Sequence, residues 1–92
     1  MVYGSVTATG QPEGVGFTAT RSSKGIYAVS FERRFNQPPT VVVVINDQAG
    51  NDDIAKVNQV NRESFIVQIS DIPAGFVRDD ARFSFIALGR RN

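Results

Sequence analysis

The chain has 92 residues, enough for one domain spanning 1–92 with a modest core, because so short a chain buries only about 60% of its unfolded surface. It contains neither cysteine nor histidine, which excludes disulfides, thiolate metal sites, and the commonest general base and metal ligand. The net charge of +1, with scattered basic residues, argues against nucleic-acid binding.

Three strands are predicted in the first part of the chain. Residues 2–9 (VYGSVTAT) alternate small or apolar residues with Ser and Thr, and residues 16–20 (GFTAT) repeat the pattern after a connection at 10–14. In 26–33 (IYAVSFER), Tyr27, Val29 and Phe31 fall on one face at a period of two. This face is expected to point into a core.

The strongest strand former, residues 40–45 (TVVVVI), follows Pro38 and Pro39 directly. Proline lacks the N–H that a sheet needs, so the pair marks the entry into a strand after the chain has turned a corner from 26–35. This strand is apolar on both faces, which predicts burial on both sides. One side would meet the opposite sheet, and the other would be covered by a second subunit or by the same chain.

Three more strands are predicted at 54–60, 64–70 and 82–88, of which the first two form a hairpin. In the last strand Phe83, Phe85 and Ala87 share one face. No window has the period of a helix, and glycine-containing turns separate the strands. The fold class is therefore all-β, a six- to seven-stranded antiparallel β-sandwich or a small barrel.

The stretch VSFERRFNQPPTVVVVIN, residues 29–46, resembles the H-type lectin domain, in which a Phe-ending strand leads through Pro-Pro into an apolar strand. Pieces at 54–60, 64–67 (SFIV) and 83–87 (FSFIA) extend the resemblance over about 25–89. The same pattern is similar to C-terminal modules of phage tail fibres and collagen-like bacterial surface proteins. The resemblance implies an H-type-lectin-like sandwich that assembles as a homotrimer or hexamer, with sugar bound between subunits.

Two polar loops carry the candidate carbohydrate-binding residues. Carboxylate, amide and guanidinium groups can hydrogen-bond to sugar hydroxyls, and an aromatic ring can stack on a sugar ring. The lectins' acidic, basic, His and Trp positions are not matched at 21–25, 51–53 and 72–76, so the candidates come from the loops themselves. The candidates are Asp47, Asn51, Asp52, Asp53, Phe76 and Arg78.

Each cluster of charged or aromatic residues also has an alternative interpretation. The acidic run at 51–53 does not have the spacing of an EF-hand, and a solvated loop is the alternative to a binding site. Asp79 and Asp80 are adjacent, which favours ion pairing with arginines over the facing carboxylates of a glycosidase. Tyr3 and Tyr27 are further candidates for stacking on sugar.

These patterns predict a non-enzymatic, carbohydrate-binding module that acts as a homo-oligomer, with glycans as partners and sites near subunit boundaries. The alternative is a structural trimerisation or tip module of a phage tail fibre or bacterial surface protein, without a ligand of its own. We expect no catalytic residue, metal or cofactor. The longest apolar run, 41–45, is far below the ~20 residues of a membrane helix, so no membrane insertion is expected. An extracellular, cell-surface or virion location is expected, although no signal peptide opens the chain.

Overall fold

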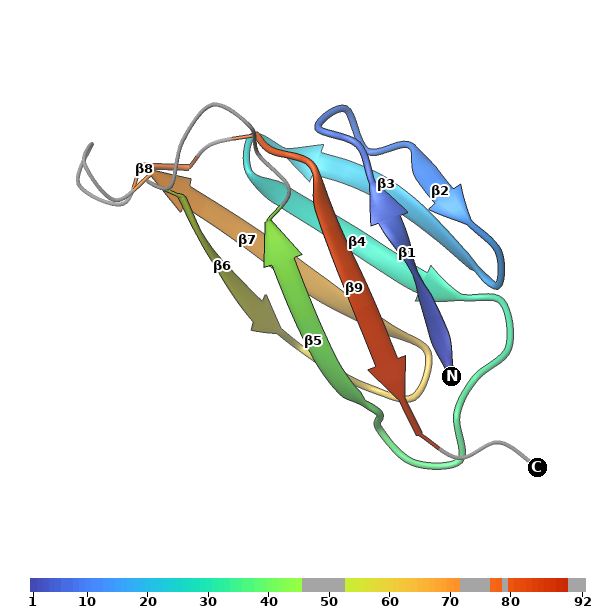
Figure 1. Ribbon diagram of the computed structural model, residues 1–92. Coiled ribbons are helices and arrows are strands. Elements are labelled where there is room, and N and C mark those ends of the chain that lie inside the picture. Colours follow the sequence, from blue (N-terminus) through green and yellow to red (C-terminus); the bar gives the residue numbers. More distant parts are fainter. Residues whose placement is uncertain (46–52, 72–76, 79, 90–92) are drawn as a thin grey trace.

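In the computed structural model, the described residues are 1–45, 53–71, 77–78 and 80–89. They form nine strands and no helix (Figure 1). The strands are β1 (Val2–Val6), β2 (Pro12–Gly14), β3 (Phe17–Ser23), β4 (Ile26–Phe31), β5 (Thr40–Ile45), β6 (Asp53–Asn58), β7 (Ser64–Asp71), β8 (Val77–Arg78) and β9 (Phe83–Leu88).

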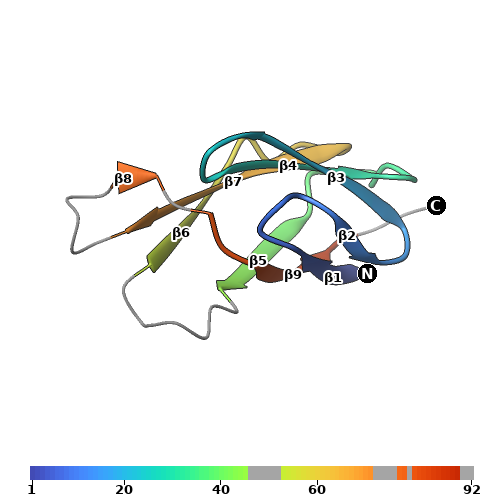
Figure 2. The same cartoon turned by 90° about the horizontal axis from the view of Figure 1, so that it is seen from above.

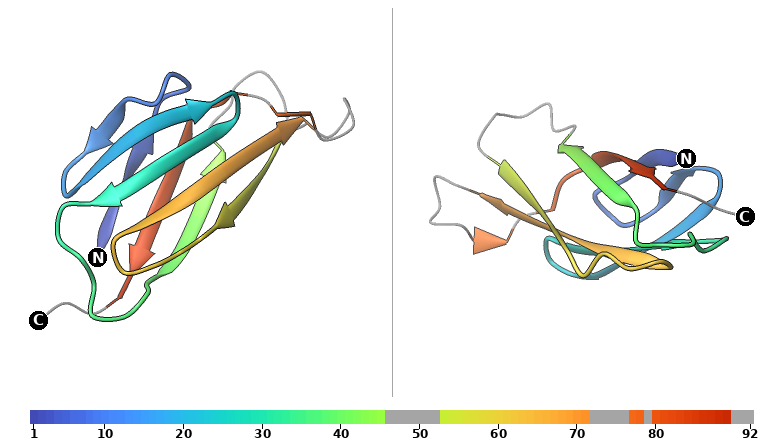
Figure 3. Two further views of the ribbon diagram at one scale, coloured as in Figure 1. Left: turned by 180° about the vertical axis from the view of Figure 1, so that it is seen from behind. Right: turned by 90° about the horizontal axis from the view of Figure 1, so that it is seen from below.

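Two antiparallel sheets face each other, as the view from above shows (Figure 2). One sheet has the strand order β2-β1-β9-β5. The other has the order β3-β4-β7-β6, and β8 also pairs with β7 (Figure 3). Because β6 and β8 both pair with Ser70 and Asp71, they lie on opposite edges of β7, and β8 continues the edge that β4 occupies.

The predicted all-β antiparallel β-sandwich is confirmed, whereas its H-type-lectin-like character stays a prediction. Each of the seven predicted strands has a counterpart, and the strand at 40–45 has the predicted bounds. The strands β2 and β8 were not predicted from the sequence. A strand that begins at Pro12 and ends at Gly14 contains residues that strands generally avoid, and a two-residue strand is too short to show a period.

A row of phenylalanine rings fills the space between the sheets. Phe85 of β9 contacts Phe17 of β3 and Phe65 of β7, with ring centroids 4.9 and 5.1 Å apart. Phe31 continues the row, 5.7 Å from Phe65 and 4.9 Å from Phe35. All five side chains are buried, and most of these ring pairs meet edge to face, the arrangement that aromatic rings favour. The row therefore joins the two sheets.

Both faces that the sequence assigned to the core are buried. Tyr27, Val29 and Phe31 of β4 are between 0% and 8% exposed. The predicted inward residues of β9, at 83, 85 and 87, are likewise buried. The period-two alternation thus gave the correct inner face for the central strands of both sheets.

Two opposed glycines let the core approach the backbone of the β1–β2 hairpin. Gly4 lies opposite Gly14, and the ring of Phe17 packs against both. A Cβ atom at Gly4 would lie only 2.5 Å from the Cε1 atom of Phe17. Glycine at this position therefore makes room for a core ring.

The residues before β5 carry the chain from one sheet to the other. β4 belongs to the sheet of β7 and β5 to the sheet of β9, so residues 32–39 turn the corner that the two prolines predicted. The corner is held by Phe35, whose N–H donates to the Arg62 carbonyl at 2.9 Å. The Nε atom of Arg62 donates in return to the Phe35 carbonyl at 3.0 Å.

The burial predicted for both faces of β5 is wrong within a single chain. β5 is the last strand of its sheet, and its inward side chains Val41, Val43 and Ile45 are only half-buried. On the outward face, Val42 is 52% exposed and Val44 59% exposed. The described residues therefore leave the outward face of this strand exposed, and cover by a second subunit stays a prediction.

Candidate functional site

The predicted carbohydrate site lies mostly outside the described residues, which exclude Asp47, Asn51, Asp52 and Phe76. Asp53 and Arg78 were predicted to lie on loops, but Asp53 begins β6 and Arg78 ends β8. The correction is small for Asp53, which had been placed just before the predicted strand at 54–60, and larger for Arg78, because the strand β8 was not predicted.

The backbones of Asp53 and Arg78 lie on opposite sides of the end of β7. Asp53 is the cross-strand neighbour of Asp71, and Arg78 is the neighbour of Ser70. Adjacent strands are about 4.8 Å apart, so the two backbones are separated by roughly 10 Å. The structure therefore brings the two candidate loops to the same end of the sandwich at these positions.

Asp80 is the centre of a hydrogen-bonded cluster that involves two other strands. Its carboxylate accepts bonds from the Arg21 Nε atom at 3.0 and 3.1 Å, and an ion pair to the Arg21 guanidinium measures 2.9 Å. The Gly25 N–H donates to the same carboxylate at 2.7 Å. This cluster attaches the segment before β9 to the β3–β4 turn.

Tyr27 completes the cluster from inside the core. Its hydroxyl donates to the Ala8 carbonyl at 2.7 Å and lies 3.3 Å from the Asp80 carboxylate. Burial, together with the charge of Asp80, raises the pKa of Tyr27 to about 12, so the hydroxyl keeps its proton. With its side chain buried and its hydroxyl bonded, Tyr27 is a core residue and not the sugar-stacking residue considered from the sequence.

Acidification is expected to weaken this cluster. The hydrogen bonds from Arg21 lower the pKa of Asp80, and the bond from the Gly25 amide acts in the same direction. The unfolded chain, with its carboxyl pKa near about 4, therefore binds more protons than the folded chain in the acid range. The stabilisation is fully present at pH values above the pKa of the unfolded chain, and it is lost as the pH falls through the lower pKa of the folded chain.

Asp80→Asn should accordingly lower the free energy of unfolding at pH 7 by about 1 kcal/mol, because asparagine keeps one acceptor oxygen but loses the charge and the second oxygen that hold Arg21. The variant should also lose less stability than the parent between neutral and acid pH. Urea unfolding at a series of pH values measures both effects. Glu32→Gln, which removes an exposed carboxylate at the opposite end of β4, is the control. Parallel pH profiles for the parent and Asp80→Asn would contradict the assignment.

Arg82 and Glu13 form a second ion pair, on the outward face of the sheet that contains β9. The ion pairing with an arginine that the sequence favoured for Asp80 is present, with Arg21 as its partner, whereas the pair between Glu13 and Arg82 was not predicted. Among the residues that the structure describes, no group of three acidic side chains could hold a metal ion.

The outward face of the β2-β1-β9-β5 sheet carries a contiguous apolar surface. Cross-strand pairing places Tyr3 of β1 beside Ile86 of β9, and Ile86 beside Val42 of β5. All members are substantially exposed, from 44% for Ile86 to 64% for Tyr3. We call this surface the outer apolar face; it consists of Tyr3, Val42, Val44, Ile86 and Leu88.

The outward face of the other sheet is different in character. Its positions alternate with buried core residues and are mostly hydroxyl, amide and ammonium groups; the apolar side chains between them are small or half-buried, except for Ile54, which is 46% exposed. The polar members are Thr18, Thr20, Ser30, Lys56, Asn58, Ser64 and Gln68. Water is therefore a suitable neighbour for this face, in contrast to the outer apolar face.

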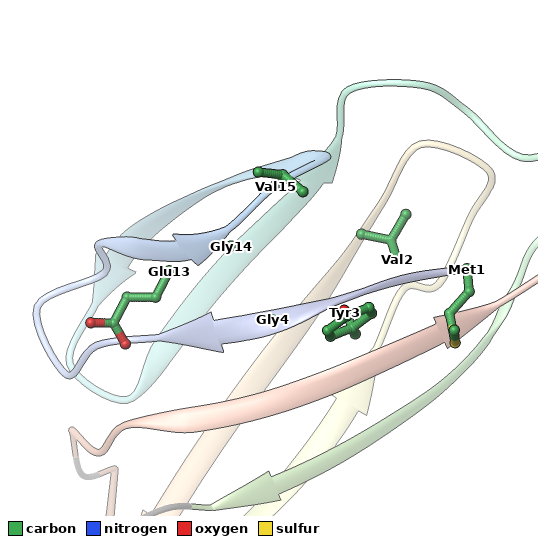
Figure 4. Close-up of a pocket in the computed structure, with 7 residues that line it drawn as sticks. All are labelled: Met1, Val2, Tyr3, Gly4, Glu13, Gly14 and Val15. Atoms are coloured by element: carbon green, nitrogen blue, oxygen red, sulfur yellow. The ribbon is translucent and has the colours of Figure 1, made fainter.

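Two hollows accompany the outer apolar face. The smaller, of about 110 Å³, lies on the face itself between Val42, Val44 and Ile86. The larger, of about 250 Å³, is an open groove formed by the start of β1, by β2 and by the residue after it (Figure 4). Its lining residues are Met1, Val2, Tyr3, Gly4, Glu13, Gly14 and Val15.

Comparison with protein-family models, with curated proteins and with solved structures found no match for this chain. The part of the chain that the structure describes contains no helix long and apolar enough to cross a membrane.

Proposed function

We propose that this chain is a non-enzymatic assembly module whose copies associate through the outer apolar face. The observation that carries the proposal is the row of exposed apolar side chains on three adjacent strands. Monomeric proteins rarely expose contiguous apolar patches larger than a few hundred Å², and larger patches usually mark an interface. The outward face of the other sheet is more polar, which supports the same assignment, because most of the exposed large apolar side chains lie on the β2-β1-β9-β5 sheet.

The rim of the outer apolar face is suited to an interface between copies. Glu13 and Arg82 lie beside it as an exposed ion pair, and the hydroxyls of Ser5 and Ser84 hydrogen-bond to each other at 2.7 Å within it. Satisfied polar groups at these places limit the cost of removing water from the face. An apolar centre with a polar rim is the usual composition of a protein interface.

A homotrimer, or a hexamer made from two trimers, is the assembly that we propose from the H-type lectin resemblance. In that form the chain would serve as a structural trimerisation or tip module of a fibre or surface protein, located on a virion, on a cell surface or outside the cell. Sedimentation velocity across a range of protein concentrations tests the assembly. A chain that stays monomeric at high micromolar concentration would overturn the proposal.

A second candidate function is carbohydrate binding near the subunit boundaries. It is favoured by the position of Asp53 and Arg78, whose backbones lie on either side of the end of β7. An acid and a base that flank one strand end provide both acceptors and donors for sugar hydroxyls. Several weak sites on one oligomer would act together, since linked sites raise avidity by orders of magnitude.

A glycan array probed with the intact oligomer tests this second function. We expect Asp53→Ala and Arg78→Ala to reduce the signal about tenfold or more while the oligomer persists, because each removes a charged hydrogen-bonding group. Lys56→Ala, an exposed position further along β6, is the matched control and should bind as the parent does. If the intact oligomer gives no array signal, either with or without Ca²⁺, carbohydrate binding is excluded and only the assembly function remains.

A further inference from the structure

Apart from the two-residue β8, the described part of the sandwich has four strands at the edges of its sheets, β2 and β5 in one and β3 and β6 in the other. An edge strand presents unpaired N–H and C=O groups, which can pair with another chain. Natural proteins block such edges with charges, prolines, bulges or short strands. A comparison of the four edges therefore shows which one lacks such features.

Three of the edges carry such blocking features. β2 has only three residues and includes Pro12 and Glu13. The pairing of β3 shifts register between Arg21 and Ser23, which interrupts the strand near its end. β6 carries the exposed Lys56 in its middle. Each feature opposes the addition of another strand at that edge.

The edge at β5 has none of these features. Its six residues, TVVVVI, contain no charge, proline or glycine, and they pair with β9 in continuous register from Thr40 to Ile45. All six are β-branched, the residues that fit a sheet best. Uncharged six-residue segments of this kind readily pair with identical segments of other chains.

The inward face of β5 gives a second, independent indication. Val41, Val43 and Ile45 are only half-buried, whereas their cross-strand neighbours on β9 are buried. A partner that packs flat on the outer apolar face would leave these three side chains as they are. A strand placed beside β5 would instead cover apolar surface on both of its faces.

We propose that β5 pairs with β5 of a second copy, antiparallel and about a two-fold axis, so that the two sheets continue into one. In such a pair, directly opposite residues point to the same face of the sheet. The two-fold axis must therefore lie midway between the two copies of one residue, so that this residue faces its own copy. An axis at Val43 places Val42 opposite the partner subunit's Val44, and Val41 opposite the partner subunit's Ile45. Every facing pair within 41–45 is then apolar.

This contact is separate from the face-to-face contact of the proposed function. It uses the backbone edge of β5, and its two-fold symmetry makes pairs of copies. The outer apolar face, if it forms trimers, uses a three-fold axis. The two contacts together give a closed hexamer where the two-fold axes cross the three-fold axis at right angles, and each contact can fail without the other.

Cysteine cross-linking tests the edge contact directly, because the chain has no cysteine of its own. In Val43→Cys the two thiols would be directly opposite, with Cα atoms about 4.5–5.5 Å apart, within the range of a disulfide. We expect mild oxidation to convert most of this variant to a dimer that a reducing agent separates. Val41→Cys is the matched control, since the two copies of residue 41 would be offset by about 13 Å along the strands.

The outcomes separate the edge contact from the face contact. Equal cross-linking of Val43→Cys and Val41→Cys, or none in either, would overturn the edge pairing. Cross-linking that is confined to Ile86→Cys would also overturn it, while it would support the contact through the outer apolar face. Efficient dimers from Val43→Cys in a background with Ile86→Lys would establish the edge contact even where the face contact is lost. Circular dichroism confirms that each variant keeps the sheet structure.

Discussion

Replacing Phe65 with alanine is expected to lower the free energy of unfolding by about 3–5 kcal/mol. The Phe65 side chain is fully buried on β7, and its ring lies 5.1 Å from that of Phe85 on the opposite sheet and 5.7 Å from that of Phe31. The substitution removes apolar contacts from both sheets and leaves a cavity between them. Domains of this size are stable by only about 5–15 kcal/mol, so the loss is a large fraction of the total.

Urea unfolding at a fixed protomer concentration measures the effect, because subunit association makes the apparent stability depend on concentration. Val15→Ala is the control: Val15 is 86% exposed, and its truncation should change stability by no more than about 0.5 kcal/mol. A loss below about 1 kcal/mol for Phe65→Ala would show that the rings do not form the core between the sheets.

Ile86→Lys is expected to dissociate the oligomer, raising the dissociation constant of the subunits at least about 100-fold. Ile86 is 44% exposed in the single chain, so a lysine there can reach water and the fold is retained. In the proposed assembly the same position is covered, and an unpaired ammonium group would lose its hydration without a compensating partner.

Sedimentation equilibrium of the parent and the variant measures the shift in association. Thr20→Lys places the same charge on the polar outward face of the other sheet and should leave the assembly unchanged. If Ile86→Lys forms the same oligomer as the parent, the outer apolar face is not the contact between copies.

The sequence predicted the structural elements that are determined by residues close together in the chain. The strand at 40–45 follows two prolines and consists of β-branched residues, and both its bounds and the corner before it are confirmed. The inward faces of the strands at 26–31 and 83–88 follow from alternation alone. These features depend on neighbouring residues, which a single sequence displays.

Features that depend on distant residues could not be read in this way. The sequence favoured an ion pair between Asp80 and an arginine, but nothing in it indicated that the partner is Arg21, 59 positions away. Similarly, the position of β5 at an edge is set by the order of the whole sheet. The strand β8 was missed for a different reason, since its two residues are too few to show a period. Of the candidate binding residues, only the backbones of Asp53 and Arg78 are placed, on opposite edges of β7.

The strand order has a consequence for how the protein is made. β9 lies between β1 and β5, so the first and fifth strands of the chain share no direct pairing and are joined only by the ninth. During synthesis, β1 therefore has no central neighbour until residues 83–88 have left the ribosome. The five-stranded layer can begin to form earlier, but the aromatic row closes only when Phe85 arrives. Until then both edges of the TVVVVI segment are exposed in the nascent chain. A chaperone would be most useful during this interval.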